Sequence, residues 1–289
     1  MKVTLFLMSK KGLESLRMII KSFGSKIIDH VYTRKDTGVL DDYFLDITQL
    51  CAQHNIDWSS GDVLYEVKTK LAIAISWRWM ITTDKTLIVL HDSLLPQYKG
   101  WAPLVTALIN EEERVGVSAF IAQEGECDSG DLVEQESIQL SYPIKIERAI
   151  DLIIPAYVKI CYNILSGGEL KPIPQPKQGG TYSMWLDTED YQVDWNDSAH
   201  NIVNFINAVG FPYGGAGSTV PPYGVVKIQD AEVFPDATIM GRERHIGKVF
   251  TTSDNKYVVV AGEGMVKLNK VVISNGEELP MEKFRLRFK

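Results

Sequence analysis

Three short apolar runs in the first third of the chain restrict its fold more than any other feature. Residues 3–8, 71–76 and 86–90 are apolar almost throughout, and each run has the length of a strand buried on both faces of a parallel sheet. After the first run, apolar residues such as Leu13 and Leu16 recur at the spacing of an amphipathic helix. Strands that alternate with helices predict an α/β domain with a Rossmann-like, mostly parallel sheet.

The same patterns extend this domain to about residue 180. Further strands are expected at 27–33, 115–121 and 132–140, and further helices at 42–54, 103–110 and 145–165. Residues 167–180 are rich in Pro and Gly, which is typical of a semi-extended linker. We therefore expect two domains, one at 1–180 and a smaller one at 181–289.

Short strand patterns separated by turn residues dominate the second domain. They cover residues 225–228, 231–234, 247–251, 257–261 and 265–272. A helix is predicted at 198–209, with Ser198 as its N-terminal cap and Gly210 as its terminator. Several short strands in succession favour a β-barrel-like (OB-like) domain.

The charge of the chain argues against a partner with many phosphates. The net charge is −7 at pH 7, and the isoelectric point is near 5.3. Residues 181–289 carry 11 Lys and Arg against 14 Asp and Glu. Proteins that bind long nucleic acids usually neutralise the phosphates with clustered basic residues, so we expect no such partner.

Cysteine usage and hydropathy predict the compartment. Three cysteines, Cys51, Cys127 and Cys161, lack metal-ligand spacing and suit a reducing cytoplasm, so neither a disulfide framework nor a metal site is expected. For Cys127, packing under a loop is preferred to a nucleophilic role. Residues 1–8 fit a first strand better than a secretion signal, and no apolar run is long enough to span a membrane. Assembly into a homodimer stays open.

Three motifs lie in or next to the predicted strands. A His-x-Ser-Leu-Leu-Pro-x-x-x-Gly motif begins at His91, Gly-Val-Ser occupies residues 116–118, and Asp-x-Gly begins at Asp128. A histidine at the carboxyl end of a parallel strand lies where the sites of such sheets gather. A carboxylate that reaches it from a later loop can orient the ring and support proton transfer. His91 and Asp128 are therefore the candidate catalytic pair.

In order and spacing these motifs resemble the formyltransferase superfamily, whose members transfer a formyl group from N10-formyltetrahydrofolate to an amine. Asp128 lies 37 positions after His91. The resemblance implies that His91 transfers protons or stabilises the oxyanion and that Asp128 supports it. For either residue alone, a structural role at a strand end or in a turn would be preferred, but the matched pair favours catalysis. The resemblance is firm over residues 70–140 and thinner elsewhere.

One position departs from the superfamily pattern. The usual Asn two residues before the histidine is replaced by Val89, whose side chain cannot donate a hydrogen bond to the oxyanion. Loss of one such donor typically lowers the rate by about 10² to 10³. Protonated His91, a backbone N–H, or a side chain of Asp92 or Ser93 could replace it. A catalytically retired module that binds folate or a nucleotide is therefore a further alternative.

The resemblance also implies where the pterin ring of N10-formyltetrahydrofolate binds. One segment follows the strand at 71–76 and offers apolar side chains, although core packing is an equal alternative for its two tryptophans. The other is a loop before Asp128 whose glycine allows close backbone approach. The predicted cofactor residues are Trp77, Trp79, Met80, Ile81, Gln123 and Gly125.

Four residues are candidates for binding the acceptor substrate. Ser9 and Lys10 lie between the first strand and the first helix, where a phosphate could bind, although solvated lysines are preferred because the full glycine-rich fingerprint is absent. Lys99 could contact an anionic acceptor or remain a solvated turn residue. Tyr213 could shape a pocket for a base, although joining the domains is preferred.

The two-domain layout and the acidic tail together favour one class of acceptor. Methionyl-tRNA formyltransferase has a comparable layout, but the acidic second domain argues against tRNA as the acceptor. Sugar N-formyltransferases, which modify nucleotide-linked amino-dideoxy sugars for surface polysaccharides, need no basic surface. The preferred function is therefore sugar N-formylation, on a substrate such as a UDP-linked precursor of pseudaminic acid.

Overall fold

The computed structural model describes residues 2–61, 64–123, 127–176, 178–280 and 285–289. The chain divides into two compact units. The first unit comprises Met1–Leu104, Glu113–Leu140 and Arg148–Trp185, and the second comprises Val105–Glu112, Ser141–Glu147 and Leu186–Lys289. The second unit thus adds two short segments from the first half of the chain to the C-terminal part.

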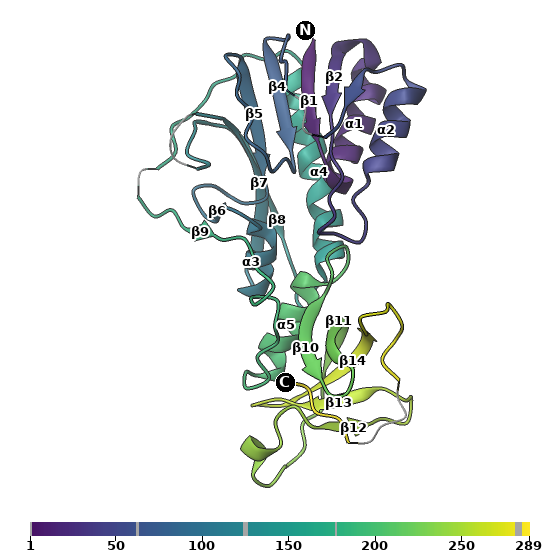
Figure 1. Ribbon diagram of the computed structural model, residues 1–289. Coiled ribbons are helices and arrows are strands. Elements are labelled where there is room, and N and C mark those ends of the chain that lie inside the picture. The colour runs from purple at the N-terminus through teal and green to yellow at the C-terminus, as the bar shows by residue number, and fades with distance from the viewer. Residues whose placement is uncertain (1, 62–63, 124–126, 177, 281–284) are drawn as a thin grey trace. The chain divides into compact units, whose positions relative to one another are not determined.

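A seven-stranded sheet forms the centre of the first unit (Figure 1). Its strands are β1 (Val3–Leu7), β2 (Ile28–Tyr32), β3 (Trp58–Ser59), β4 (Leu71–Ile75), β5 (Thr86–His91), β7 (Arg114–Ile121) and β8 (Leu132–Gln139). Their order is β3-β2-β1-β4-β5-β7-β8. The first five strands in this order, from β3 through β2, β1 and β4 to β5, run parallel to one another. Strand β7 is antiparallel to both β5 and β8. The mostly parallel sheet confirms the predicted α/β class.

Helices of this unit pack against the sheet and against each other. They are α1 (Ser9–Phe23), α2 (Phe44–Gln53) and α4 (Ile146–Leu165), and α1 lies beside α2 (Figure 1). A Cβ added to Gly12 of α1 would lie 3.1 Å from the Leu7 Cβ, so α1 crosses the end of β1 closely. The buried Leu13, Leu16 and Ile19 confirm the apolar face predicted from the helical spacing.

Aromatic rings gather on the sheet face opposite Leu7, because successive residues of a strand point to opposite faces. The aromatic cluster consists of Phe6, Tyr32, Tyr65, Trp77 and Trp79. The Phe6 ring centroid lies 4.8 Å from that of Tyr32 and 5.2 Å from that of Trp77. The small side chains of Ala72 and Ala74 on β4 leave room for these rings. The segment that follows β4 is therefore anchored to the sheet.

A five-stranded antiparallel sheet and one helix form most of the second unit. Its strands are β10 (Ala216–Val220), β11 (Gly224–Phe234), β12 (Val249–Thr251), β13 (Tyr257–Val260) and β14 (Met265–Val272), in the order β10-β11-β14-β13-β12. The helix α5 (Ala199–Val209) begins at Ser198, whose side chain accepts a hydrogen bond of 3.1 Å from the Asn201 N–H. This confirms the predicted cap. The shorter α3 spans Pro103–Ile109.

Two details of the second unit differ from the sequence prediction. Residues 225–228 and 231–234 belong to one strand, β11, in which the register shifts beside Asp230 and forms a β-bulge. The polar residues at the bulge had the pattern of a turn. Residues 216–220 form β10, which was not predicted because its small residues lack a clear apolar alternation.

Three findings concern the remaining predictions about the whole chain. Within the described ranges, no helix is long and apolar enough to cross a membrane. In that same part of the chain, no group of three or more His, Cys, Asp or Glu side chains could hold a metal ion. The three cysteines are free thiols, of which Cys51 and Cys161 are buried.

Candidate active site

His91 is the last residue of β5 and is buried. Its Nε2 lies 2.8 Å from the backbone oxygen of Tyr98. Because a carbonyl oxygen only accepts hydrogen bonds, this contact assigns the proton of the neutral ring to Nε2. Nδ1 then carries the lone pair and is the ring atom that can accept a proton from a substrate.

Asp128 lies next to that nitrogen. Its Oδ2 is 3.7 Å from His91 Nδ1 and accepts a hydrogen bond of 2.7 Å from the Gly100 N–H. The separation is too long for a direct hydrogen bond, but the carboxylate is close enough to stabilise a positive charge on the ring. The structure therefore brings together the two residues that the motifs single out, in a geometry suited to proton transfer.

The Gly-Val-Ser motif holds the turn that follows His91. Ser118 Oγ donates a hydrogen bond of 2.5 Å to the Ser93 backbone oxygen and accepts one of 3.0 Å from the Leu95 N–H. It also accepts a hydrogen bond of 2.8 Å from Gln135 Nε2 on β8. The side chain of Ser93 in turn donates to the Gln97 backbone oxygen at 2.6 Å. The motif serine thus fixes the backbone of the turn from a neighbouring strand.

Two motif glycines are required by close contacts. A Cβ on Gly116 would lie 2.4 Å from Leu94 Cδ2, so the glycine admits the leucine of the histidine motif. A Cβ on Gly130 would lie 1.7 Å from the backbone oxygen of Ile121, where β8 begins beside the end of β7. Both distances are far below van der Waals contact, and the glycines therefore set the positions of the two site loops.

Gln175 contributes to the site but was not predicted. Its Nε2 donates hydrogen bonds of 2.8 Å and 2.7 Å to the backbone oxygens of Asp128 and Gly130. Nearby, Ile173 and Leu132 exchange two backbone hydrogen bonds of 2.8 Å. The Pro/Gly composition of the segment indicated only a linker, and no local pattern reveals a side chain that binds a distant loop.

A buried charge network adjoins the candidate catalytic pair. Asp92 binds Lys11 Nζ through one carboxylate oxygen and the Tyr157 hydroxyl through the other. The network connects the residue after His91 with α1 and α4, and Tyr157 is almost completely buried. Since Asp92 and Lys11 neutralise each other, the network positions the loop rather than offering a free charge to a substrate.

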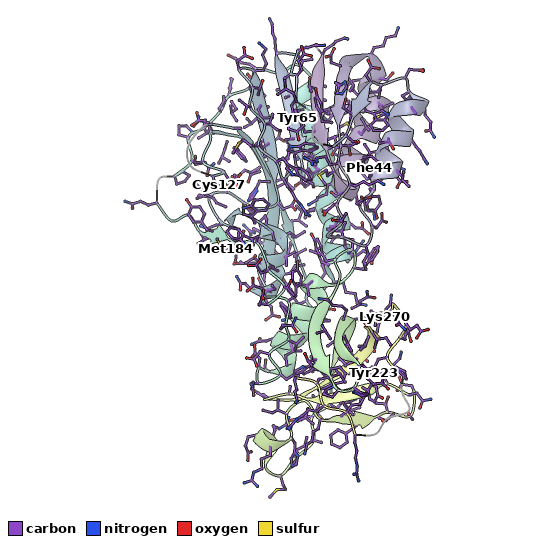
Figure 2. All side chains as sticks on the ribbon, in the orientation of Figure 1. Phe44, Tyr65, Cys127, Met184, Tyr223 and Lys270 are labelled. Carbon is purple, nitrogen blue, oxygen red and sulfur yellow. The ribbon has the colours of Figure 1, made fainter. Side chains whose placement is uncertain are left out.

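Partial desolvation of the thiol, and then the adjacent Asp128 carboxylate, raise the pKa of Cys127 to about 11. The Cys127 Sγ lies 3.4 Å from Asp128 Oδ2, to which it donates a hydrogen bond. Only the thiolate is a strong nucleophile, and its population at neutral pH is therefore very small. Figure 2 shows Cys127 near the loops that carry β6 (Lys99–Gly100). The raised pKa argues against a nucleophilic role, but Cys127 is exposed and does not pack under a loop.

The predicted cofactor residues lie in different environments. Trp77 packs against the aromatic cluster, where Figure 2 places Tyr65 beside the large sheet, and Ile81 packs against the same buried face as Val89. Trp79 is partly exposed and contacts Trp77 at 5.3 Å between ring centroids, whereas Met80 is 86% exposed. Gln123 is exposed, and Gly125 lies outside the described residues.

The predicted acceptor residues have different neighbours. Ser9 Oγ donates to Ser76 Oγ at 3.0 Å, and Lys10 Nζ lies 2.6 Å from Asp151 Oδ1. Lys99 is buried in β6 (Lys99–Gly100), which pairs with β9 (Tyr182–Ser183). The buried position of Lys99 differs from the solvated alternative, whereas Lys10 keeps a partly exposed side chain beside Asp151. Tyr213 belongs to the second unit, in the turn after α5.

The sequence matches two related families. The family "Formyl transferase" matches residues 73–147, and the family "Formyl transferase, C-terminal domain" matches residues 186–289. A curated relative, the methionyl-tRNA formyltransferase of Streptococcus agalactiae serotype III (strain NEM316), is 27% identical over 187 residues. This alignment covers 64% of the chain and 57% of the relative, so the chain spans little more than half the length of that protein.

Two solved structures are similar in fold. WlaRD, a sugar 3N-formyl transferase crystallised with dTDP and 5-N-formyl-THF, superposes with a TM-score of 0.68 at 19% identity, and the match covers 93% of this chain and 98% of that one. HypX from Aquifex aeolicus, in complex with tetrahydrofolic acid, gives a TM-score of 0.65 at 17% identity and covers 97% of this chain and 46% of HypX. Both similarities concern the fold.

Proposed function

We propose that this chain, which belongs to the formyl transferase family, transfers a formyl group from N10-formyltetrahydrofolate to the amino group of a nucleotide-linked amino-dideoxy sugar. The observation that carries the proposal is the pair formed by His91 Nδ1 and Asp128 Oδ2. We assign catalysis to a domain at 1–180 and a supporting role to the smaller domain at 181–289. Free cysteines suit a reducing environment, so we propose the cytoplasm as the compartment.

The residues after β4 fit a folate. Trp77 Nε1 is buried and has no hydrogen-bond partner among the described residues, so it can donate to a polar ring that binds there. The partly exposed Trp79 offers an aromatic face beside it. Trp77, Trp79 and Ile81 would therefore hold the pterin, and the bound folate would supply the formyl group.

His91 performs the proton transfer in this proposal. Its Nε2–H remains bound to the Tyr98 backbone oxygen, while Nδ1 accepts the proton that the attacking amine releases. Asp128 Oδ2 stabilises the resulting imidazolium, and the Gly100 N–H keeps that carboxylate in place. The same Nδ1–H can later return the proton to the leaving nitrogen.

Because Val89 stands in place of the usual Asn, another group must donate a hydrogen bond to the oxyanion. Ser93 Oγ already donates to the Gln97 backbone oxygen, and Asp92 accepts hydrogen bonds from Lys11 and Tyr157. The turn side chains considered as replacements are therefore occupied. We propose that the protonated His91 Nδ1–H, together with a backbone N–H, stabilises the oxyanion in place of the usual Asn.

A nucleotide sugar is favoured as the acceptor by charge. The 11 basic against 14 acidic residues in 181–289 argue against a basic surface for tRNA, and a sugar 3N-formyl transferase shares the fold over 93% of the chain. A UDP-linked precursor of pseudaminic acid, used for surface polysaccharides, is the preferred substrate. The curated relatives favour methionyl-tRNA as the second candidate, and Val89 favours a retired binding module as the third.

The test is to incubate the full chain with N10-formyltetrahydrofolate and a panel of UDP- and dTDP-linked amino sugars. Mass spectrometry should detect the mass gain of one formyl group on one acceptor, together with release of tetrahydrofolate. Transfer to methionyl-tRNA alone would show that the acceptor is methionyl-tRNA and not a nucleotide-linked amino sugar. Folate binding without turnover on any acceptor would indicate that the chain is a catalytically retired binding module rather than an enzyme.

A further inference from the structure

A cavity of about 470 Å³ lies within the second unit. Its apolar walls include Ile144, Val203 and Ala231, all of them buried. The volume falls in the range of small-molecule sites, which are mostly apolar with a few convergent polar groups. The cavity therefore has the size and lining of a binding site, and it shares no residue with the site around His91.

Two buried amides supply the polar groups. Asn204 and Asn207 line the cavity from α5, and each residue is 4% exposed. Asn204 Nδ2 and Asn207 Oδ1 have no hydrogen-bond partner among the described residues. Residues three apart on a helix are neighbours on one face, so both asparagines present their side chains to the cavity from the same face of α5. Such groups are costly to bury unless something binds them.

The charges at the rim are already neutralised. Lys145 Nζ lies 2.6 Å from Asp230 Oδ2, and His200 Nε2 lies 2.6 Å from Glu111 Oε1. Glu232 is paired with Lys267 at 3.3 Å. Because Lys145, Asp230 and Glu232 each have an opposite partner among the described residues, they leave no unpaired charge at the rim to attract a charged ligand. This favours a neutral molecule.

We propose that this cavity binds a neutral nucleoside through the lactam edge of a pyrimidine base. The ring carbonyl accepts a hydrogen bond from Asn204 Nδ2, and the adjacent ring N–H donates to Asn207 Oδ1. The base packs between the apolar walls, and the remaining volume accommodates the ribose. The site is additional to formyl transfer, and its occupancy does not depend on the catalytic pair.

Uridine and 3-methyluridine test the proposal as a matched pair of probes, since the methyl group removes only the ring N–H. Isothermal titration of the full chain should give saturable uridine binding, and 3-methyluridine should bind about tenfold more weakly. Asn204→Leu and Asn207→Leu should each weaken uridine binding by a similar factor. Asn201→Leu is the control, because Asn201 is exposed on the same helix.

A second kind of variant tests the site without changing the buried residues of α5, so that a loss of binding cannot be attributed to misfolding. Val233 lines the cavity and is 52% exposed, so Val233→Trp should obstruct the entrance without disturbing the core, and uridine binding should be lost while the melting temperature is kept. His91→Asn should bind uridine normally, which separates this site from formyl transfer. Equal binding of the two nucleosides, or uridine binding that survives Val233→Trp and both Asn→Leu changes, would overturn the proposal.

Discussion

At the scale of single residues, the site depends on which ring nitrogen of His91 faces the substrate. The hydrogen bond from Nε2 to the Tyr98 backbone oxygen leaves Nδ1 toward Asp128. We therefore predict that His91→Asn lowers kcat by at least about 10², because the amide cannot accept the proton. The measurement is steady-state release of tetrahydrofolate with the acceptor that the panel of amino sugars yields.

The matched control is His54→Asn, since His54 is exposed at the end of α2. Both variants should keep the thermal stability of the unmodified chain. Unchanged turnover in His91→Asn, with normal stability, would contradict the proposed role of this histidine.

Cys127 provides a prediction with a pH dependence. Desolvation and the Asp128 carboxylate raise its pKa from 9.0 to about 11, so its thiolate population at pH 7.5 is about 100-fold below that of an ordinary cysteine. We expect slow alkylation by iodoacetamide at pH 7.5 and a rate that rises about tenfold per pH unit up to pH 10. Mass spectrometry of the modified peptide measures this rate. Alkylation at pH 7.5 as fast as that of free cysteine would contradict the expectation.

At the scale of elements, β7 and β8 can meet only because residue 130 lacks a side chain. A Cβ there would lie 1.7 Å from the Ile121 backbone oxygen, and the strand would have to shift. Gly130→Ala should therefore lower the free energy of unfolding by about 1–3 kcal/mol or more, as measured in urea. Gly168→Ala is the control because its Cβ would meet nothing within 4 Å, and an equal loss in both variants would contradict the contact argument.

The segment after α4 acts on the site through one side chain. Gln175 holds the Asp128 turn by two hydrogen bonds, and a small displacement of a catalytic group can cost a large factor in rate. Gln175→Leu should lower kcat about tenfold or more with little change in KM, because the lost bonds position the carboxylate rather than bind substrate. Gln178→Leu, at an exposed position of the same segment, should leave both constants unchanged. A change in KM alone would indicate a role in binding.

At the scale of the whole molecule, patterns within short stretches of sequence predicted the features that depend only on neighbouring residues, such as strands and helix caps. The buried strands β1, β4 and β5 and the cap at Ser198 follow from apolar runs and one hydroxyl residue, and the structure contains them. The bulge near Asp230 and the contacts of Gln175 depend on segments that are distant in sequence. The environment of Lys99 likewise depends on pairing with residues 182–183, which its own neighbours do not encode.

The charge of the whole chain gives the last prediction, which decides between the two acceptors. With a net charge of −7, the chain should bind tRNA with a Kd weaker than about 10⁻⁴ M at 150 mM salt, because few phosphates can be neutralised. Fluorescence anisotropy of labelled tRNA over 50–300 mM salt measures both affinity and salt dependence. Submicromolar binding with a steep salt slope would reveal a basic surface assembled despite the acidic total, and tRNA would become the preferred acceptor.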